Sequence, residues 1–113
     1  MDTIYTGDYA VRPFTVLNKA TGVPFDLTDH KITYRCEREG VPSVLALNYN
    51  SDDNPTIVVV TDAVEGELEV RILGTDTDDF VVGATYFEQV RVEDEDTNKC
   101  VIIEQRFVAR RAF

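Results

Sequence analysis

The sequence predicts an all-β fold, an antiparallel β-sandwich of seven or eight strands with at most one short helical turn. In residues 31–37, the side chains of Ile32, Tyr34 and Cys36 alternate with polar ones, which is the period of a half-buried strand. Similar segments recur about every ten residues between Gly, Pro, Asn and Asp, as in a sandwich or small barrel. The 113 residues are enough for one domain, 1–113, with a single hydrophobic core.

Turn residues separate the expected strands. Gly7-Asp8 and Gly22-x-Pro24 are turn sequences, and Leu27 follows as a plug for one end of the sandwich. Residues 75–80 are expected to form the helical turn, with Thr75 or Asp76 capping its amides. The expected strands are residues 4–5, 9–17, 31–39, 44–49, 56–61, 67–73, 84–93 and 99–109.

Three of these strands carry a more detailed prediction. Pro13 has no backbone N–H to donate, so the second strand is expected at a sheet edge or a bulge. In 44–49, odd-numbered and even-numbered side chains are expected on opposite faces. Residues 56–61 are apolar nearly throughout, which is typical of a strand at the centre of a sheet.

The charge of the chain is unevenly distributed. Of a net charge of −10, the segment 62–96 holds twelve acidic side chains against Arg71 and Arg91. Such a surface repels duplex DNA, and we expect no nucleic-acid partner. Residues 99–113 are basic, and we expect 110–113 to form a basic tail. The sign difference either orients a protein neighbour or reflects only a solvated acidic face.

The sequence contains no signal-peptide pattern and no apolar stretch long enough to cross a bilayer. We therefore expect a soluble protein made in the cytoplasm, without a membrane partner. Cys36 is expected to face inward and Cys100 outward, so both should be free thiols. A disulfide of the sandwich type is the alternative, although the chain has no Trp to pack on it.

Neither a metal site nor a catalytic site is expected from the motifs. Asp94-x-Asp96-x-Asn98 has the spacing that begins an EF-hand loop, but the required Gly and the final Glu are absent, so a hairpin turn is favoured. A calcium site that joins two acidic clusters, 76–79 and 52–53, is the alternative. His30 is the single histidine and has no adjacent nucleophile motif. We expect no cofactor and no enzyme activity.

Most aromatic residues are expected in the core, because rings at strand positions fill the space between sheets. Tyr49 and Phe113 are expected to be exceptions. Together with the basic side chains of Arg110 and Arg111, they are the candidate partner-binding residues.

The chain resembles the immunoglobulin-like domain of tailed-phage virion proteins, as found at the N-terminus of phage baseplate upper proteins. The residues that carry the resemblance are Tyr5-x-Gly7-Asp8, Gly22-x-Pro24-x-Asp26-Leu27-Thr28, Ile32-Thr33-Tyr34, Gly66 with Leu68-x-Val70, Asp76-Thr77-x-x-Phe80-x-x-Gly83-x-x-Tyr86 and Phe107-x-Ala109. Arg106 stands where the pattern often has a glycine.

The resemblance implies a non-enzymatic structural component of a tailed-phage particle, in the tail or baseplate, the neck or the capsid decoration. Its implied location is the virion, and its implied partners are other virion proteins and symmetric copies of itself. A carbohydrate- or receptor-binding sandwich module is the alternative, with exposed aromatics around Tyr49 as its signature. A small enzyme or inhibitor domain acting on a host protein is a third interpretation.

Overall fold

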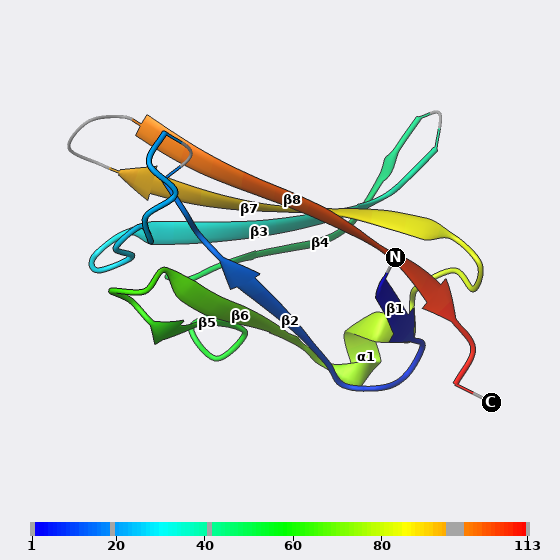
Figure 1. Ribbon diagram of the computed structural model, residues 1–113. Helices are drawn as coiled ribbons and strands as arrows, with labels where there is room; N and C mark the ends of the chain where they lie inside the picture. Colours follow the sequence, from blue (N-terminus) through cyan, green and yellow to red (C-terminus); the bar gives the residue numbers. More distant parts are fainter. Residues whose placement is uncertain (1, 19, 41, 95–98, 113) are drawn as a thin grey trace.

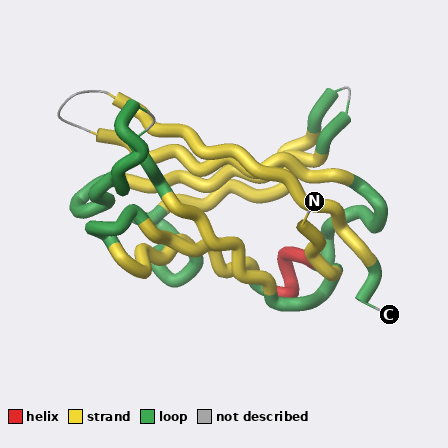
Figure 2. Tube along the Cα trace, viewed as in Figure 1, coloured by secondary structure: helices red, strands yellow, loops and turns green. Residues whose placement is uncertain are grey.

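The computed structural model describes residues 2–18, 20–40, 42–94 and 99–112. Two β-sheets pack face to face, as the ribbon and the tube show (Figures 1 and 2), which confirms the predicted all-β sandwich. One sheet has the strand order β1-β8-β7-β3-β4 and the other the order β2-β6-β5. The elements are β1 Asp2–Tyr5, β2 Ala10–Thr15, β3 Lys31–Arg38, β4 Val44–Asn50, β5 Val58–Asp62, β6 Glu67–Ile72, α1 Gly74–Thr77, β7 Thr85–Asp94 and β8 Lys99–Arg110.

The core lies between the two sheets and follows the predicted alternation. Ile32, Tyr34 and Cys36 of β3 are fully buried, and Leu27 is buried in the same core. Cys36 is a free cysteine, as expected. The backbone of Cys100 pairs with Glu93, but the Cys100 side chain lies outside the described residues. Among the side chains that the structure describes, the remaining buried apolar residues are Ile4, Phe14, Val16, Val58, Leu68, Val70, Ile72, Phe80, Tyr86, Val90, Val92, Phe107 and Ala109.

The prediction that residues 56–61 lie at the centre of a sheet is wrong. β5 pairs with β6 alone and forms an edge of the three-stranded sheet, whereas Pro13 lies at the opposite edge, in β2, as predicted. Val58 is buried but Val60 is 38% exposed. An apolar run therefore marks an edge strand here, because the smaller sheet leaves part of β5 uncovered.

The expected division of faces in β4 is also wrong. The pairing of β3 with β4 shifts register between Cys36 and Glu37, so Cys36 lies opposite Leu47 and Glu37 lies opposite Leu45. The extra residue in β4 reverses the alternation, because a one-residue shift moves every later side chain to the other face. Leu45 consequently points away from the core side while Leu47 packs against it.

Three smaller expectations are corrected. The helical turn α1 has Leu73 at its N-cap and no side-chain cap, so neither Thr75 nor Asp76 caps it. Tyr5 and Tyr9, expected in the core, are 49% and 56% exposed. They occupy outward positions on β1 and just before β2, where neither sheet covers them.

Two glycines hold the loops close to the sandwich. Gly66 has a φ of 70°, and a Cβ there would overlap the backbone oxygens of Val16 and Phe25. Gly7, with a φ of 81°, forms the turn between β1 and β2 and lies against Gly74 of α1. The hydroxyl of Thr77 donates a 2.8 Å hydrogen bond to the carbonyl of Asp8, which fixes α1 on this turn.

Candidate interaction surface

The strands at the four outer positions of the two sheets, β1, β4, β2 and β5, differ in how well they are protected from pairing with another strand. β1 has only four residues, β2 contains Pro13, and β5 has five residues and a register shift next to its final Asp62. β4 has seven residues, VLALNYN, with neither a charge nor a proline. Charges, prolines and short length are the usual defences of an edge. The β4 edge is thus the least protected of the four.

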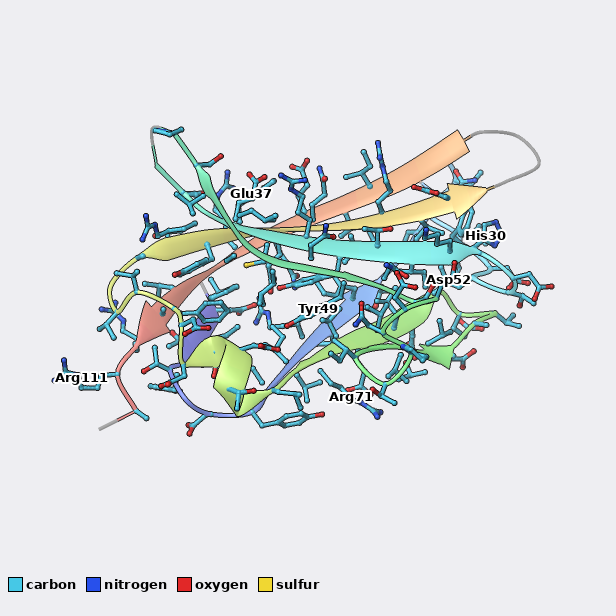
Figure 3. The ribbon with its side chains drawn as sticks, turned by 180° about the vertical axis from the view of Figure 1, so that it is seen from behind. His30, Glu37, Tyr49, Asp52, Arg71 and Arg111 are labelled. Carbon is cyan, nitrogen blue, oxygen red and sulfur yellow. The ribbon has the colours of Figure 1, made fainter. Side chains whose placement is uncertain are left out.

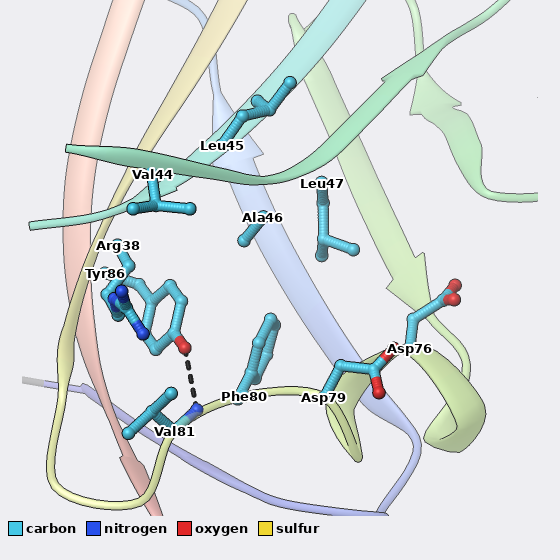
Figure 4. A pocket seen from close by; sticks show the side chains of 10 residues that line it. All are labelled: Arg38, Val44, Leu45, Ala46, Leu47, Asp76, Asp79, Phe80, Val81 and Tyr86. Atoms are coloured by element: carbon cyan, nitrogen blue, oxygen red, sulfur yellow. Dashed lines mark hydrogen bonds between the residues drawn. The ribbon is translucent and has the colours of Figure 1, made fainter.

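A cavity of about 260 Å³ lies beside this edge, between β4 and the chain from α1 to the start of β7 (Figure 4). We call it the β4 groove. It is smaller than the roughly 300–1,000 Å³ of typical small-molecule sites, and much of its lining is apolar. Its lining residues are Arg38, Val44, Leu45, Ala46, Leu47, Asp76, Asp79, Phe80, Val81 and Tyr86.

The floor of the β4 groove is held rigidly. Phe80 and Tyr86 are both buried, with ring centroids 4.6 Å apart, and Tyr86 stacks on Phe107 at 5.2 Å. The Tyr86 hydroxyl accepts a 2.8 Å hydrogen bond from the backbone N–H of Val81 (Figure 4). Aromatic clusters of this kind keep their geometry because each ring is fixed by its neighbours. The groove is therefore a preformed feature of the fold.

Tyr49 of β4 holds Asp76, one of the residues that line the groove. Its ring stacks on Tyr34 with centroids 6.1 Å apart, and its hydroxyl donates a 2.6 Å hydrogen bond to Asp76. Burial and the neighbouring Asp76 carboxylate raise the pKa of Tyr49. Beyond it, the carbonyl of Asn50 accepts a hydrogen bond from the N–H of Asn54. The free part of the β4 edge therefore runs from Val44 to Tyr49.

Opposite charges line the two ends of the groove. Arg38 lies directly opposite Val44 in the β3–β4 pairing. Asp76 lies at the Tyr49 end, and Asp79 lies near it and away from Arg38 (Figure 4). Among the described residues, Arg38 and Asp79 have no ion-pair partner. The groove thus has a basic end and an acidic end that do not neutralise each other.

The residues proposed from sequence for partner binding do not form one site. Tyr49 is half-buried and packs against the core, contrary to its expected exposure. Arg110 is the last residue of β8 and pairs with Tyr5, so the tail begins one residue later than expected. Arg111 is exposed and lies at one end of the molecule, far from Tyr49 (Figure 3). Phe113 lies outside the described residues.

His30 and the acidic clusters have ordinary structural surroundings. The Nδ1 atom of His30 donates a 2.8 Å hydrogen bond to the carbonyl of Thr28, and the ring packs edge-on against Phe25. Within the described residues, no group of three or more His, Cys, Asp or Glu could hold a metal ion. The EF-hand-like segment around Asp96 lies outside them.

Sequence reasoning missed a buried ionic cluster between the sheets. Arg12 of β2 is 6% exposed and Glu88 of β7 is fully buried. Arg12 donates hydrogen bonds of 2.8 Å and 2.9 Å to the two carboxylate oxygens of Glu88, and a third of 3.1 Å to Asp2. Tyr34 donates a 2.9 Å bond to the same carboxylate. The signal was present in the alternation, because Glu88 has the parity of Tyr86 and Val90.

The cluster shifts the ionisation of its neighbours. Burial, and secondarily the Glu88 charge, raises the pKa of Tyr34 and raises the pKa of the Cys36 thiol to about 12. Burial alone would lower the pKa of Arg12, but the hydrogen bond and charge of Glu88, with those of Asp2, outweigh it and leave that pKa raised. Among the described side chains, every buried polar atom has a hydrogen-bond partner. The cluster therefore joins the sheets and has no buried polar atom left to bind a ligand.

Neither a protein-family model, nor a curated protein, nor a solved structure matches the chain. No helix in the described part of the chain has the length and apolar character needed to cross a lipid bilayer. The β4 edge and its groove are consequently the surface on which a function can be argued.

Proposed function

We propose that the chain is a non-enzymatic structural component of a tailed-phage particle, which acts by assembling with other proteins. The observation that supports assembly is the β4 edge, seven residues without a charge or proline beside a groove that has one basic and one acidic end. Exposed backbone N–H and C=O groups on such an edge pair readily with a strand of another chain. The phage particle is supported by the resemblance of the turn and strand residues, from Gly7-Asp8 to Phe107-x-Ala109.

Quantitative mass spectrometry of particles tests this proposal. Particles of the phage that encodes the chain would be purified through a density gradient, and the chain is expected to co-purify with the other virion proteins in fixed stoichiometry. A chain that remains in the cell lysate and is absent from the particles would contradict the proposal. Binding of the isolated domain to a glycan array, together with that absence, would favour the carbohydrate-binding alternative.

A further inference from the structure

We propose that the β4 edge pairs with the β4 edge of a second copy of the chain, antiparallel and about a two-fold axis. The inference deepens the proposed assembly function, on which it rests, by naming the partner and the geometry. In this arrangement the two five-stranded sheets become one continuous sheet across the contact. Two-fold contacts are the commonest in symmetric assemblies, and each copy then uses the same surface.

The distribution of charge in the β4 groove favours a second copy as the occupant. In an antiparallel pair, the Val44 end of one strand lies beside the Tyr49 end of the other. Arg38 marks the first end, and Asp76 and Asp79 mark the second. The two-fold axis therefore brings the basic end of each groove to the acidic end of the other, and both unpaired charges gain a partner. Such complementarity fixes the register of an interface.

The shape and charge of the strand itself allow this pairing. Residues 44–49 carry no charge, so like charges do not meet across the new strand pair. Val44 and Leu45 are 45% and 49% exposed and lose part of that exposure when another strand covers them. The excess acidic charge of the chain is concentrated in 62–96, which lies wholly outside β4. Its long-range repulsion is largely screened at about 0.15 M salt, where the Debye length is about 8 Å.

Sedimentation equilibrium of the full chain tests the pairing. Measured from about 1 µM to about 1 mM, the range of weak to moderate dissociation constants, the wild type is expected to form dimers. Arg38→Glu and Asp79→Arg should each weaken dimerisation about tenfold, because each reversal replaces two attractive contacts per dimer by two repulsive ones. Arg35→Glu, the same charge reversal on the outer face of β3, is the matched control and should leave dimerisation unchanged.

Mixing the two charge variants gives the sharper result. A heterodimer of Arg38→Glu with Asp79→Arg has two attractive contacts, whereas each homodimer has two repulsive ones. An equimolar mixture should therefore regain wild-type dimerisation. Thermal unfolding of each variant alone establishes that it is folded, and Leu45→Lys replaces any variant that is not.

Three outcomes would overturn the pairing: a wild type that stays monomeric throughout, charge variants that dimerise like the wild type, or a mixture that does not recover. A monomeric chain that is still found in purified particles would refute this contact and leave the proposed function standing. If the chain dimerises as predicted but is absent from particles, the β4 contact stands and the proposed function is refuted.

Discussion

The interior cluster around Glu88 and the β4 edge differ in two ways. The cluster is buried and its polar groups have hydrogen-bond partners, whereas the β4 edge lies at the surface with its outer side unpaired. The interior contains charged side chains, Arg12 and Glu88, yet each finds hydrogen-bond partners within the chain. The β4 strand itself carries no charge, and among the described residues its outer edge has no other strand beside it. Charge is therefore buried at the first place and absent from the strand at the second.

The two regions therefore have different roles: the cluster stabilises the fold, and the β4 edge is available for interaction. A buried charge is tolerable only when its partners are present, so the cluster makes the two sheets depend on each other. An unpaired edge contributes little to the fold, and its groups remain available to another chain. Changes in the cluster should therefore alter unfolding, and changes at β4 should alter association.

Arg12→Met should have the largest effect of these variants, a loss in the free energy of unfolding. It leaves the Glu88 carboxylate buried without its cation, which typically costs about 3–5 kcal/mol. Urea unfolding followed by fluorescence or circular dichroism measures the loss. The triple variant Arg12→Met, Glu88→Leu, Tyr34→Phe removes all three polar partners and should recover most of the stability. If the triple variant is as unstable as the single one, the loss of stability comes from altered packing between the sheets and not from the unpaired Glu88 charge.

Alkaline pH should weaken the same region. The pKa of Cys36 rises from an ordinary value of 9.0 to about 12 in the folded chain, and that of Tyr34 is also raised. As pH increases above 9.0, the unfolded thiol ionises and the buried one does not. The contribution of Cys36 to stability is thus fully present below that pH and falls by about 1.4 kcal/mol per pH unit above it, and Tyr34 adds to the decline only above its own ordinary pKa of 10.0. In urea unfolding at stepped pH, Cys36→Ala should show a shallower decline, and an unchanged slope would contradict this assignment.

Tyr49→Phe tests the boundary between the two regions. The variant loses the hydrogen bond to Asp76 but keeps the ring against Tyr34, so unfolding free energy should fall by about 1 kcal/mol. Dimerisation should change little, since the Asp76 charge remains. Thermal unfolding and sedimentation of the same sample check both expectations. A large loss of stability would show that the hydroxyl fixes more than Asp76.

The smallest expected effect on stability comes from Leu45→Lys. Its side chain is 49% exposed and points away from the core, so the free energy of unfolding should change by no more than about 0.5 kcal/mol. A lysine on an edge strand nevertheless disfavours pairing with another strand. Dimerisation should weaken while the melting temperature stays near that of the wild type. The reverse result would place Leu45 in the core and not at an interface.

Alternation predicted the inward face of the fold well, because parity is a local property of a strand. It placed Ile32, Tyr34 and Cys36 inside, and the same rule applied to Glu88 would have identified the buried acid. A charged residue is ordinarily assigned to the surface, because burying it without a partner is costly. The partner Arg12 could not be paired with it, since the two are brought together only by sheet packing.

The interaction surface was less predictable. The bulge in β4, opposite the step from Cys36 to Glu37, is set by the pairing of two strands, and nothing in the residues 44–49 alone reveals it. The edge position of β5 likewise depends on how the strands are distributed between sheets. The groove combines β4 with Asp76 and Phe80, which only the folded chain brings together. Sequence therefore predicted the strands but not which of their edges would stay free.

The neighbouring position of β1 and β8 determines how the domain bears a load. The two strands run parallel through the pairs Asp2↔Phe107 to Tyr5↔Arg110. A force that pulls apart the residues before β1 and those after β8 acts along both strands in opposite directions. The hydrogen bonds between them are then sheared together instead of breaking one after another, which requires a larger force. The four residue pairs of β1 and β8 would therefore resist such a force together.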